Sequence, residues 1–306
     1  MNYKEINYKN YGRCLEINNG VIELIVTLDV GPRVIKFAFC GKENLFFEDV
    51  DRVFSSEKDE VKEVYGKDAK WYLYGGHRLW VGPEYGYTYY PDNIPIEYSV
   101  DANKFTFIQG LQTPFNLQGK TVLTIGEGAE VRVDMFLENK SDKTYEIAPW
   151  AITVMKAGGW EVFPMNTNDT GWLSNRTLML WPYTNLNDDR ISFGKEFVLL
   201  KQDKEKKTPL KVGMDNNNGW SAYINDGVTF LKKFEYDQNA AYTDNGCNFE
   251  TYTSEYMTEI ESLGKLVKLV PGETASHYEE WKLFDTVPEK CDCPDEMGKR
   301  ILEIIK

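Results

Sequence analysis

Short stretches in which hydrophobic and polar side chains alternate recur along this chain, with the period of a β-strand. Residues 130–137 alternate strictly and follow residues 121–125 across a tight turn at residues 126–129. Residues 21–27 and 33–39 flank the turn-forming residues 29–32 and predict an opening hairpin. Further runs lie at residues 147–155, 197–200, 219–224, 228–232, 249–253, 265–270 and 278–283. This pattern predicts an all-β protein, a sandwich or barrel, and not alternating βαβ units.

Helical patterns are few. Residues 55–64 predict either a short capped helix or an acidic loop. From Pro294 onward, Met297, Ile301 and Ile305 fall on one face of a short amphipathic helix, which we expect to pack on the body. Because no linker or internal repeat precedes it, we expect one domain over residues 1–290 and a C-terminal helix over residues 291–306.

Charge and composition limit the classes of molecule that the chain is expected to bind. The chain has 35 basic and 48 acidic side chains, a net charge of −13, which disfavours nucleic acids and anionic membranes and favours a neutral small molecule. Residues 1–5 lack the apolar core of a signal peptide, and no apolar run is long enough to span a bilayer. The 5 cysteines are odd in number and scattered, as reduced thiols would be. We therefore expect a cytoplasmic protein, monomeric or homodimeric.

Only 2 histidines are present, and His77 lies in the richer surroundings. The segment Gly75-Gly76-His77-Arg78-Leu79-Trp80-Val81-Gly82-Pro83-Glu84 combines an imidazole, a guanidinium, an indole and a carboxylate after two glycines that permit close backbone approach. It predicts a site in which His77, Arg78, Trp80 and Glu84 take part. The alternative is a structural ion pair between Arg78 and Glu84. His277 is predicted to be a solvated residue at a strand end.

Two later segments add candidates. Glu250 and Tyr252 point to one side of their predicted strand, and a carboxylate in a partly dry aromatic cleft could serve as a general base. A solvated strand face is the alternative for Glu250. Trp150 and Trp160 bracket a strand and the Gly158-Gly159 pair, with Lys156 between them. Indoles interspersed with amides and hydroxyls suit a pyranose, which offers an apolar face and a polar rim.

Other chemistries have little support. No phosphate loop, dinucleotide fingerprint, serine elbow or zinc-protease helix is present. Cys291-Asp292-Cys293 lacks a second Cys or His pair that would complete a zinc site. We therefore predict no metal and no cofactor.

Three segments carry a resemblance to the galactose mutarotase-like (aldose 1-epimerase-like) superfamily, and to a bacterial branch with the Gly-Gly-His-Arg-Leu-Trp segment. They are residues 31–35, the stretch from Asn139 to the strand of Pro149 and Trp150, and Phe249-Glu250-Thr251 with Pro271-Gly272-Glu273 after it. The resemblance spans most of residues 21–284 and implies a large antiparallel β-sandwich of the supersandwich type.

The same resemblance implies anomer interconversion of an aldose. In that chemistry a late-strand Glu removes the proton of the anomeric hydroxyl, and a His protonates the ring oxygen. Glu250 matches the position of the base, and His77 falls near a supporting histidine. The chain departs from the pattern at the main acid, where Trp150 stands in place of a His.

Three functions follow. The first is an aldose 1-epimerase-like isomerase with catalytic Glu250 and His77, in which Arg78, Glu84, Lys156, Trp80, Trp150 and Trp160 bind the sugar. The second is a carbohydrate-binding protein without catalysis. The third is a glycoside hydrolase or lyase, which would use Glu84 with Glu250 as its carboxyl pair.

Overall fold

Two large antiparallel sheets make up most of the computed structural model, which describes residues 1–56 and 59–306. The described residues of the first sheet form 11 strands in the order β1-β2-β3-β4-β7-β12-β21-β20-β17-β14, with β22 paired to β12. These strands are β1 (Asn2–Asn7), β2 (Arg13–Asn18), β3 (Ile22–Thr27), β4 (Val34–Phe39), β7 (His77–Gly82), β12 (Tyr145–Lys156), β14 (Leu178–Leu180), β17 (Leu210–Met214), β20 (Phe249–Thr253), β21 (Met257–Leu263) and β22 (Val267–Leu269).

The second sheet has 10 strands within the described part of the chain, in the order β15-β16-β13-β18-β19-β23-β11-β10-β9-β8. They are β8 (Glu97–Asp101), β9 (Lys104–Ile108), β10 (Leu117–Ile125), β11 (Glu130–Asn139), β13 (Trp160–Pro164), β15 (Ile191–Phe193), β16 (Phe197–Lys201), β18 (Trp220–Asn225), β19 (Val228–Phe234) and β23 (Thr274–Phe284). A small pair, β5 (Ser55–Ser56) and β6 (Trp71–Tyr72), lies outside both sheets. This architecture confirms the all-β antiparallel sandwich.

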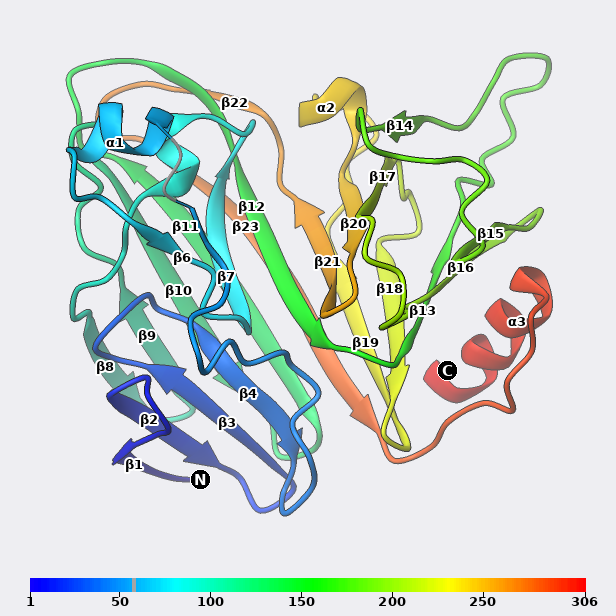
Figure 1. Ribbon diagram of the computed structural model, residues 1–306, viewed down its shortest axis with the longest axis horizontal. Helices are drawn as coiled ribbons and strands as arrows, with labels where there is room; N and C mark the ends of the chain where they lie inside the picture. The colour runs from blue at the N-terminus through cyan, green and yellow to red at the C-terminus, as the bar shows by residue number, and fades with distance from the viewer. Residues whose placement is uncertain (57–58) are drawn as a thin grey trace.

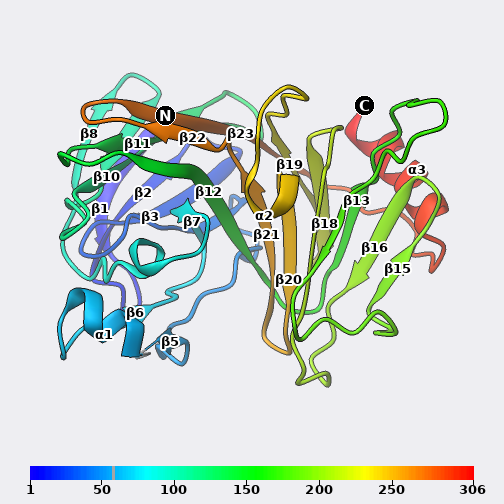
Figure 2. The same cartoon turned by 90° about the horizontal axis from the view of Figure 1, so that it is seen from above.

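The core lies between the two sheets. Val133, Met135 and Leu137 on β11 are buried and their neighbours are more exposed, as the alternation predicted. They pack in one cluster with Leu79 and Val81, which β7 contributes from the first sheet. The long central strand β12 is buried on both faces, since the core covers one and a second cluster covers the other. In Figures 1 and 2, β12 (green) runs between the early strands and β21 with β20.

Helices are short. The predicted C-terminal helix is present as α3 (Pro294–Ile305), whose Met297 and Ile301 are fully buried against Phe197 and Trp220. Figure 1 shows it (red) beside β13 and β16. The predicted element at residues 55–64 partly falls outside the described residues, and α1 (Asp59–Tyr65) overlaps its later part. The remaining helical turns are η1 (Gly86–Tyr89) and α2 (Thr243–Gly246). No described helix has the length and apolarity needed to cross a bilayer.

Candidate functional site

A cleft of about 510 Å³ opens on the face of the first sheet that points away from the core. Strands β7, β12, β21, β20 and β17 form its floor, and the segments around β5, β6, η1 and β14 form its walls. It is lined by the aromatic residues Phe54, Trp71, Trp80, Tyr89, Trp150, Trp181, Tyr183 and Tyr252, the charged residues Arg78, Glu84, Lys211, Glu259 and Glu261, and Val53, Ser55, Leu73, Ile152, Pro209 and Met257.

Strand alternation explains which side chains reach this cleft. Successive side chains of a strand point to opposite faces, and residues paired across neighbouring strands share a face. The register pairs Arg78 with Ile152 and Ile152 with Glu261. It then pairs Glu261 with Glu250. One row across four strands therefore points toward the cleft, while the intervening residues point into the core.

Aromatic rings form a continuous wall on one side of the cleft. The ring centroids of Trp71 and Trp80 are 5.2 Å apart, and those of Trp80 and Tyr89 are 5.4 Å apart. Trp80 also contacts Trp150 at 5.4 Å between centroids. The guanidinium of Arg78 lies 4.1 Å from the centre of the Trp80 ring. The contacts hold the indoles in fixed orientations, so that the wall is formed before any ligand arrives.

A lysine and two carboxyl groups form the polar centre of the floor. Lys211 Nζ lies 2.7 Å from Glu250 Oε2 and 3.0 Å from Glu261 Oε2. Trp150 Nε1 donates a hydrogen bond of 2.9 Å to the same Glu261 oxygen. Burial alone would lower the pKa of Lys211, but Glu261 and Glu250 raise it well above its usual range. Burial raises the pKa of Glu250 to about 8, against the opposing effect of Lys211.

Arg78 and Glu259 form the second charged pair, with Arg78 Nη2 3.5 Å from Glu259 Oε1. Burial lowers the pKa of Arg78 to about 10 although Glu259 opposes the shift. Burial also raises the pKa of Glu259, although Arg78 opposes it. Among the described residues, Arg78 Nε and Nη1 and Glu261 Oε1 are buried without a hydrogen-bond partner. Unpaired buried polar atoms are costly, so these atoms mark where a polar ligand would gain most.

The structure brings four of the predicted site residues together. Arg78, Trp80, Glu84 and Trp150 all line the cleft. Arg78 pairs with Glu259 and not with Glu84, whose carboxylate accepts a hydrogen bond from the Tyr89 hydroxyl. Glu250 and Glu261 are both buried, at 1% and 0% exposed, and Glu261 is among the residues that line the cleft, as is Lys211, whereas Glu250 is not.

His77 lies on the opposite face of β7, away from the cleft and from Glu250. Its Nδ1 is 3.0 Å from Thr153 Oγ1 and 3.7 Å from Glu279 Oε2, and its ring packs on Trp281 of the second sheet. Burial lowers the pKa of His77 to about 3, so the imidazole is neutral. The expected pairing of His77 with Glu250 in one pocket is therefore not found, because alternation groups His77 with the core-facing Leu79 and Val81.

The glycines before His77 do allow close approach, but to the protein itself. A side chain on Gly75 would overlap the carbonyl oxygen of Phe47, and one on Gly76 would overlap that of Val34. Both glycines have positive φ, 92° and 65°. Their role in this structure is to pack the start of β7 against neighbouring backbone.

His277 is buried, which corrects the expectation that it is solvated. It is in phase with Trp281 and Leu283 on the inward face of β23, and it is 2% exposed. Its Nε2 lies 2.7 Å from Ser262 Oγ, and its Nδ1 lies 3.5 Å from Glu235 Oε1. The chain's 2 histidines therefore both lie outside the cleft lining.

Lys156 and Trp160 also lie apart from the cleft. Lys156 stands at the far end of β12, where its Nζ pairs with Asp226 at 2.9 Å and Glu43 at 3.6 Å. Trp160 belongs to the second sheet and packs with the cluster under α3. Strand β12, which carries Trp150, is long and ends at Lys156, so its two ends lie in different parts of the molecule.

Sequence reasoning missed Lys211 and gave no role to Glu259 and Glu261. Lys211 is a single cation inside the apolar strand Leu210–Met214, a pattern that could have marked it. Glu259 and Glu261 alternate along Met257–Leu263, but Thr258 and Ser262 on the other face are also polar, so the pattern does not say which face meets the cleft.

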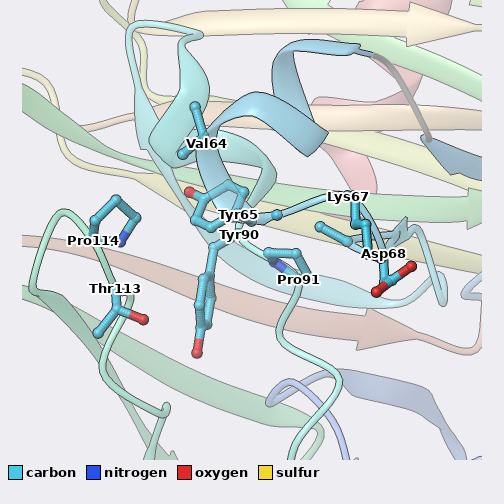
Figure 3. Close-up of a pocket in the computed structure, with 10 residues that line it drawn as sticks. Val64, Tyr65, Lys67, Asp68, Tyr90, Pro91, Thr113 and Pro114 are labelled. Carbon is cyan, nitrogen blue, oxygen red and sulfur yellow. The ribbon is translucent and has the colours of Figure 1, made fainter.

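A second, open hollow of about 660 Å³ lies beside α1. Figure 3 shows Tyr65, Tyr90, Pro91 and Pro114 around it. Its phenol hydroxyls are engaged within the protein, because Tyr65 donates to the Gly86 carbonyl and Tyr90 to the Leu111 carbonyl. The hollow therefore offers a ligand fewer polar atoms without a hydrogen-bond partner than the cleft does.

Known proteins resemble this chain in structure and not in sequence. No family model matches the sequence, and neither does any curated protein. A TPR-domain containing protein from Parabacteroides distasonis aligns with a TM-score of 0.61 and 14% identity, over 90% of this chain and 48% of that one. The chain thus spans about half the length of that protein.

Two further solved structures align with this chain over most of the length of both chains. A galactose mutarotase-like protein from Lactobacillus casei aligns with a TM-score of 0.54 and 10% identity, over 89% of this chain and 100% of that chain. Another galactose mutarotase-like protein, from Clostridium acetobutylicum, aligns with a TM-score of 0.51 and 11% identity, over 93% and 98%. The chain has the galactose mutarotase-like fold, as the sequence resemblance implied.

Proposed function

We propose that the chain binds a carbohydrate, a neutral aldose or a sugar derivative, in the cleft on the outer face of the first sheet. The observation that carries the proposal is the wall of Trp71, Trp80 and Trp150 standing over buried polar atoms of Arg78 and Glu261 that lack hydrogen-bond partners. A pyranose has an apolar face that stacks on indoles and hydroxyl groups that satisfy such atoms. The cleft volume of about 510 Å³ suits a ligand of this size.

The charges of the cleft support a neutral ligand. Among the described residues, Arg78 and Lys211 are the cations of its lining, and Glu84, Glu259 and Glu261 are its carboxyl groups. Lys211 and Arg78 are already paired with carboxyl groups of the protein. An anionic ligand would have to displace these partners, whereas sugar hydroxyls can donate to carboxylates and accept from the unpaired N–H groups.

Tryptophan fluorescence tests this proposal. A panel of aldoses and their derivatives should give, for at least one sugar, saturable quenching or a wavelength shift. Trp80→Ala should weaken that binding at least tenfold, which corresponds to about 1.4 kcal/mol. Trp172→Ala is the matched control, because Trp172 is fully exposed on a loop outside the cleft lining. A flat response over the whole panel would contradict the proposal.

The finer proposal is that the bound sugar undergoes aldose 1-epimerase-like anomer interconversion. Its support is the presence of carboxyl groups on the cleft floor whose surroundings differ, Glu259 beside Arg78 and Glu261 beside Lys211. Polarimetry of freshly dissolved α-glucose and α-galactose measures it, and acceleration over buffer is the expected result.

Binding without catalysis is the second candidate, and the absence of an imidazole from the cleft lining favours it. Saturable binding of a sugar whose anomers interconvert no faster than in buffer would identify this function. A glycosidase that uses Glu84 with Glu250 has less support, because Glu250 does not line the cleft and its carboxylate is paired with Lys211 at 2.7 Å.

A further inference from the structure

The cleft repeats one arrangement of side chains twice, on the two sides of β21. Arg78 reaches β21 from β7, and Lys211 reaches it from β17, which lies on the other side of β21 in the sheet (Figure 1). Arg78 Nη2 lies 3.5 Å from Glu259 Oε1, and Lys211 Nζ lies 3.0 Å from Glu261 Oε2. Each half of the cleft floor therefore holds one cation that is paired with one carboxyl group of β21.

The half around Arg78 combines indole rings with unsatisfied donors. The guanidinium lies 4.1 Å from the centre of the Trp80 ring and 5.6 Å from that of Trp71. Arg78 Nε and Nη1 and Trp71 Nε1 are buried, and none of the three has a hydrogen-bond partner in the described part of the chain. A sugar ring stacked on these indoles can accept hydrogen bonds from such donors through its hydroxyl groups. We call this half the Arg78 subsite, made of Arg78, Glu259, Trp71 and Trp80.

The half around Lys211 has the same composition. Lys211 Nζ lies 4.9 Å from the centre of the Trp150 ring and 4.6 Å from that of Trp181. Glu250 and Glu261, both buried, engage two of the three N–H donors of the ammonium, so within the described residues the third is available to a ligand. We call this half the Lys211 subsite, made of Lys211, Glu261, Trp150 and Trp181.

Trp181 is held beside Lys211 by the turn that follows β14, the edge strand of the first sheet. The backbone N–H of Trp181 donates to Thr184 Oγ1 at 3.2 Å, and Thr184 in turn donates to the backbone carbonyl of Lys211. Gly213 on β17 leaves room for the indole, since a Cβ there would lie 3.3 Å from Trp181 Cη2. These contacts fix the ring at this end of the cleft before a ligand binds.

The spacing of the subsites and the volume of the cleft both suit two sugar rings. Glu259 and Glu261 are two residues apart on β21, which places the subsites roughly 7 Å apart. Neighbouring rings of an oligosaccharide have a comparable separation. One pyranose displaces roughly the volume of six water molecules, about 180 Å³ at about 30 Å³ each. A single ring therefore leaves more than half of the cleft, about 510 Å³, open.

We propose that the two subsites bind two linked sugar rings, so that the ligand of this cleft is a disaccharide or a longer oligosaccharide. This inference rests on the proposed carbohydrate binding. One ring stacks on Trp80 and accepts hydrogen bonds from Arg78, and the next stacks on Trp181 and accepts from Lys211. The glycosidic bond between the rings lies over β21. Because the link makes the second contact intramolecular, a disaccharide should bind about tenfold or more tightly than its monosaccharides.

Titration calorimetry and saturation-transfer NMR test the proposal on the full chain. The probes are glucose, galactose, mannose and xylose, with maltose, cellobiose, lactose, mannobiose and xylobiose as disaccharides built from them. In the wild type, protons of both rings of the bound disaccharide should receive saturation from the protein. Trp181→Ala should abolish the transfer to one ring and Trp80→Ala the transfer to the other, and each should lower the disaccharide affinity about tenfold or more. Trp172→Ala is the control, because Trp172 is fully exposed and lies outside the cleft lining.

Trp80 and Trp181 are only partly buried, so we expect both alanine variants to fold. If either does not, the wild-type affinities and the saturation of the two rings decide the question alone. A disaccharide that binds no more tightly than its monosaccharides, or two variants that remove contact with the same ring, would overturn the two-ring proposal and leave carbohydrate binding in place. If no sugar of the panel binds, carbohydrate binding fails and the two-ring proposal fails with it.

Discussion

Replacing Lys211 by methionine is the sharpest perturbation of the cleft floor, because it keeps the length of the side chain and removes only the charge. Lys211 is 6% exposed and lies 2.7 Å from Glu250 and 3.0 Å from Glu261. At an effective dielectric constant of about 20, each contact corresponds to an attraction of about 6 kcal/mol before the cost of desolvation. Removal of one partner from a buried ion pair typically destabilises a protein by about 3–5 kcal/mol, and we expect Lys211→Met to fall in this range.

The free energy of unfolding that Lys211→Met loses should increase as the pH rises. Glu250 and Glu261 are directly opposite each other on β20 and β21, so without the opposing effect of Lys211, burial and Glu261 raise the pKa of Glu250 further in the folded state. A carboxyl whose folded pKa lies above its unfolded value stabilises the fold at low pH, and this stability is lost as the pH rises through the folded pKa. The deficit of Lys211→Met should therefore be small near pH 5 and largest above pH 8.

Urea unfolding followed by circular dichroism at pH 5, 7 and 8.5 measures this deficit. Lys156→Met is the matched control, because Lys156 is 40% exposed and pairs with Asp226 at the surface. Such exposed pairs contribute about 0–1 kcal/mol. If Lys211→Met unfolds at the same urea concentration as Lys156→Met at pH 8.5, the charged centre proposed for the cleft is wrong.

Two further predictions concern residues outside the cleft. The ring of His77 should stay neutral from pH 8 down to pH 5 in ¹⁵N NMR spectra, because burial lowers its pKa to about 3, and a titration midpoint above pH 5 would contradict its placement in the core. Ile301→Ala should destabilise the protein by about 2–5 kcal/mol, since Ile301 is fully buried on the inner face of α3. The partly buried Ile305→Ala should cost less in the same urea titration, and equal costs would contradict the packing of this helix.

The fold could be predicted because its strands follow the alternation rule locally. Residues 130–137 alternate in the sequence, and β11 buries every second side chain against the core. The amphipathic C-terminal helix could also be predicted from its local pattern, because the apolar residues on one face, Met297 and Ile301, are the ones it buries. The order of the strands within each sheet depends on contacts between distant segments, which local periodicity does not report.

The site was predicted only in part. Arg78, Trp80, Glu84 and Trp150 line the cleft, but His77 was included because it neighbours Arg78 in sequence. Neighbouring residues of a strand face opposite sides, so the same alternation that revealed the strand also separates His77 from Arg78.

The site residues that the sequence did not reveal are mainly buried charged side chains. Lys211, Glu259 and Glu261 come from two strands that a long stretch of chain separates, and they meet only through β20, which pairs with both. Trp160 and Lys156 were included because they follow Trp150 along the chain. A strand as long as β12 carries its two ends to different environments, which spacing in sequence does not show.

The indole N–H signals of the chain's 8 tryptophans offer the most direct test of sugar binding in the cleft. Trp71, Trp80, Trp150 and Trp181 line it, whereas Trp160, Trp172, Trp220 and Trp281 do not. Titration of the ¹⁵N-labelled protein with the aldose panel should move the first group of signals in a saturable way and leave the second group in place. If no sugar moves the first group, or if a sugar moves only the second, the cleft is not the carbohydrate site.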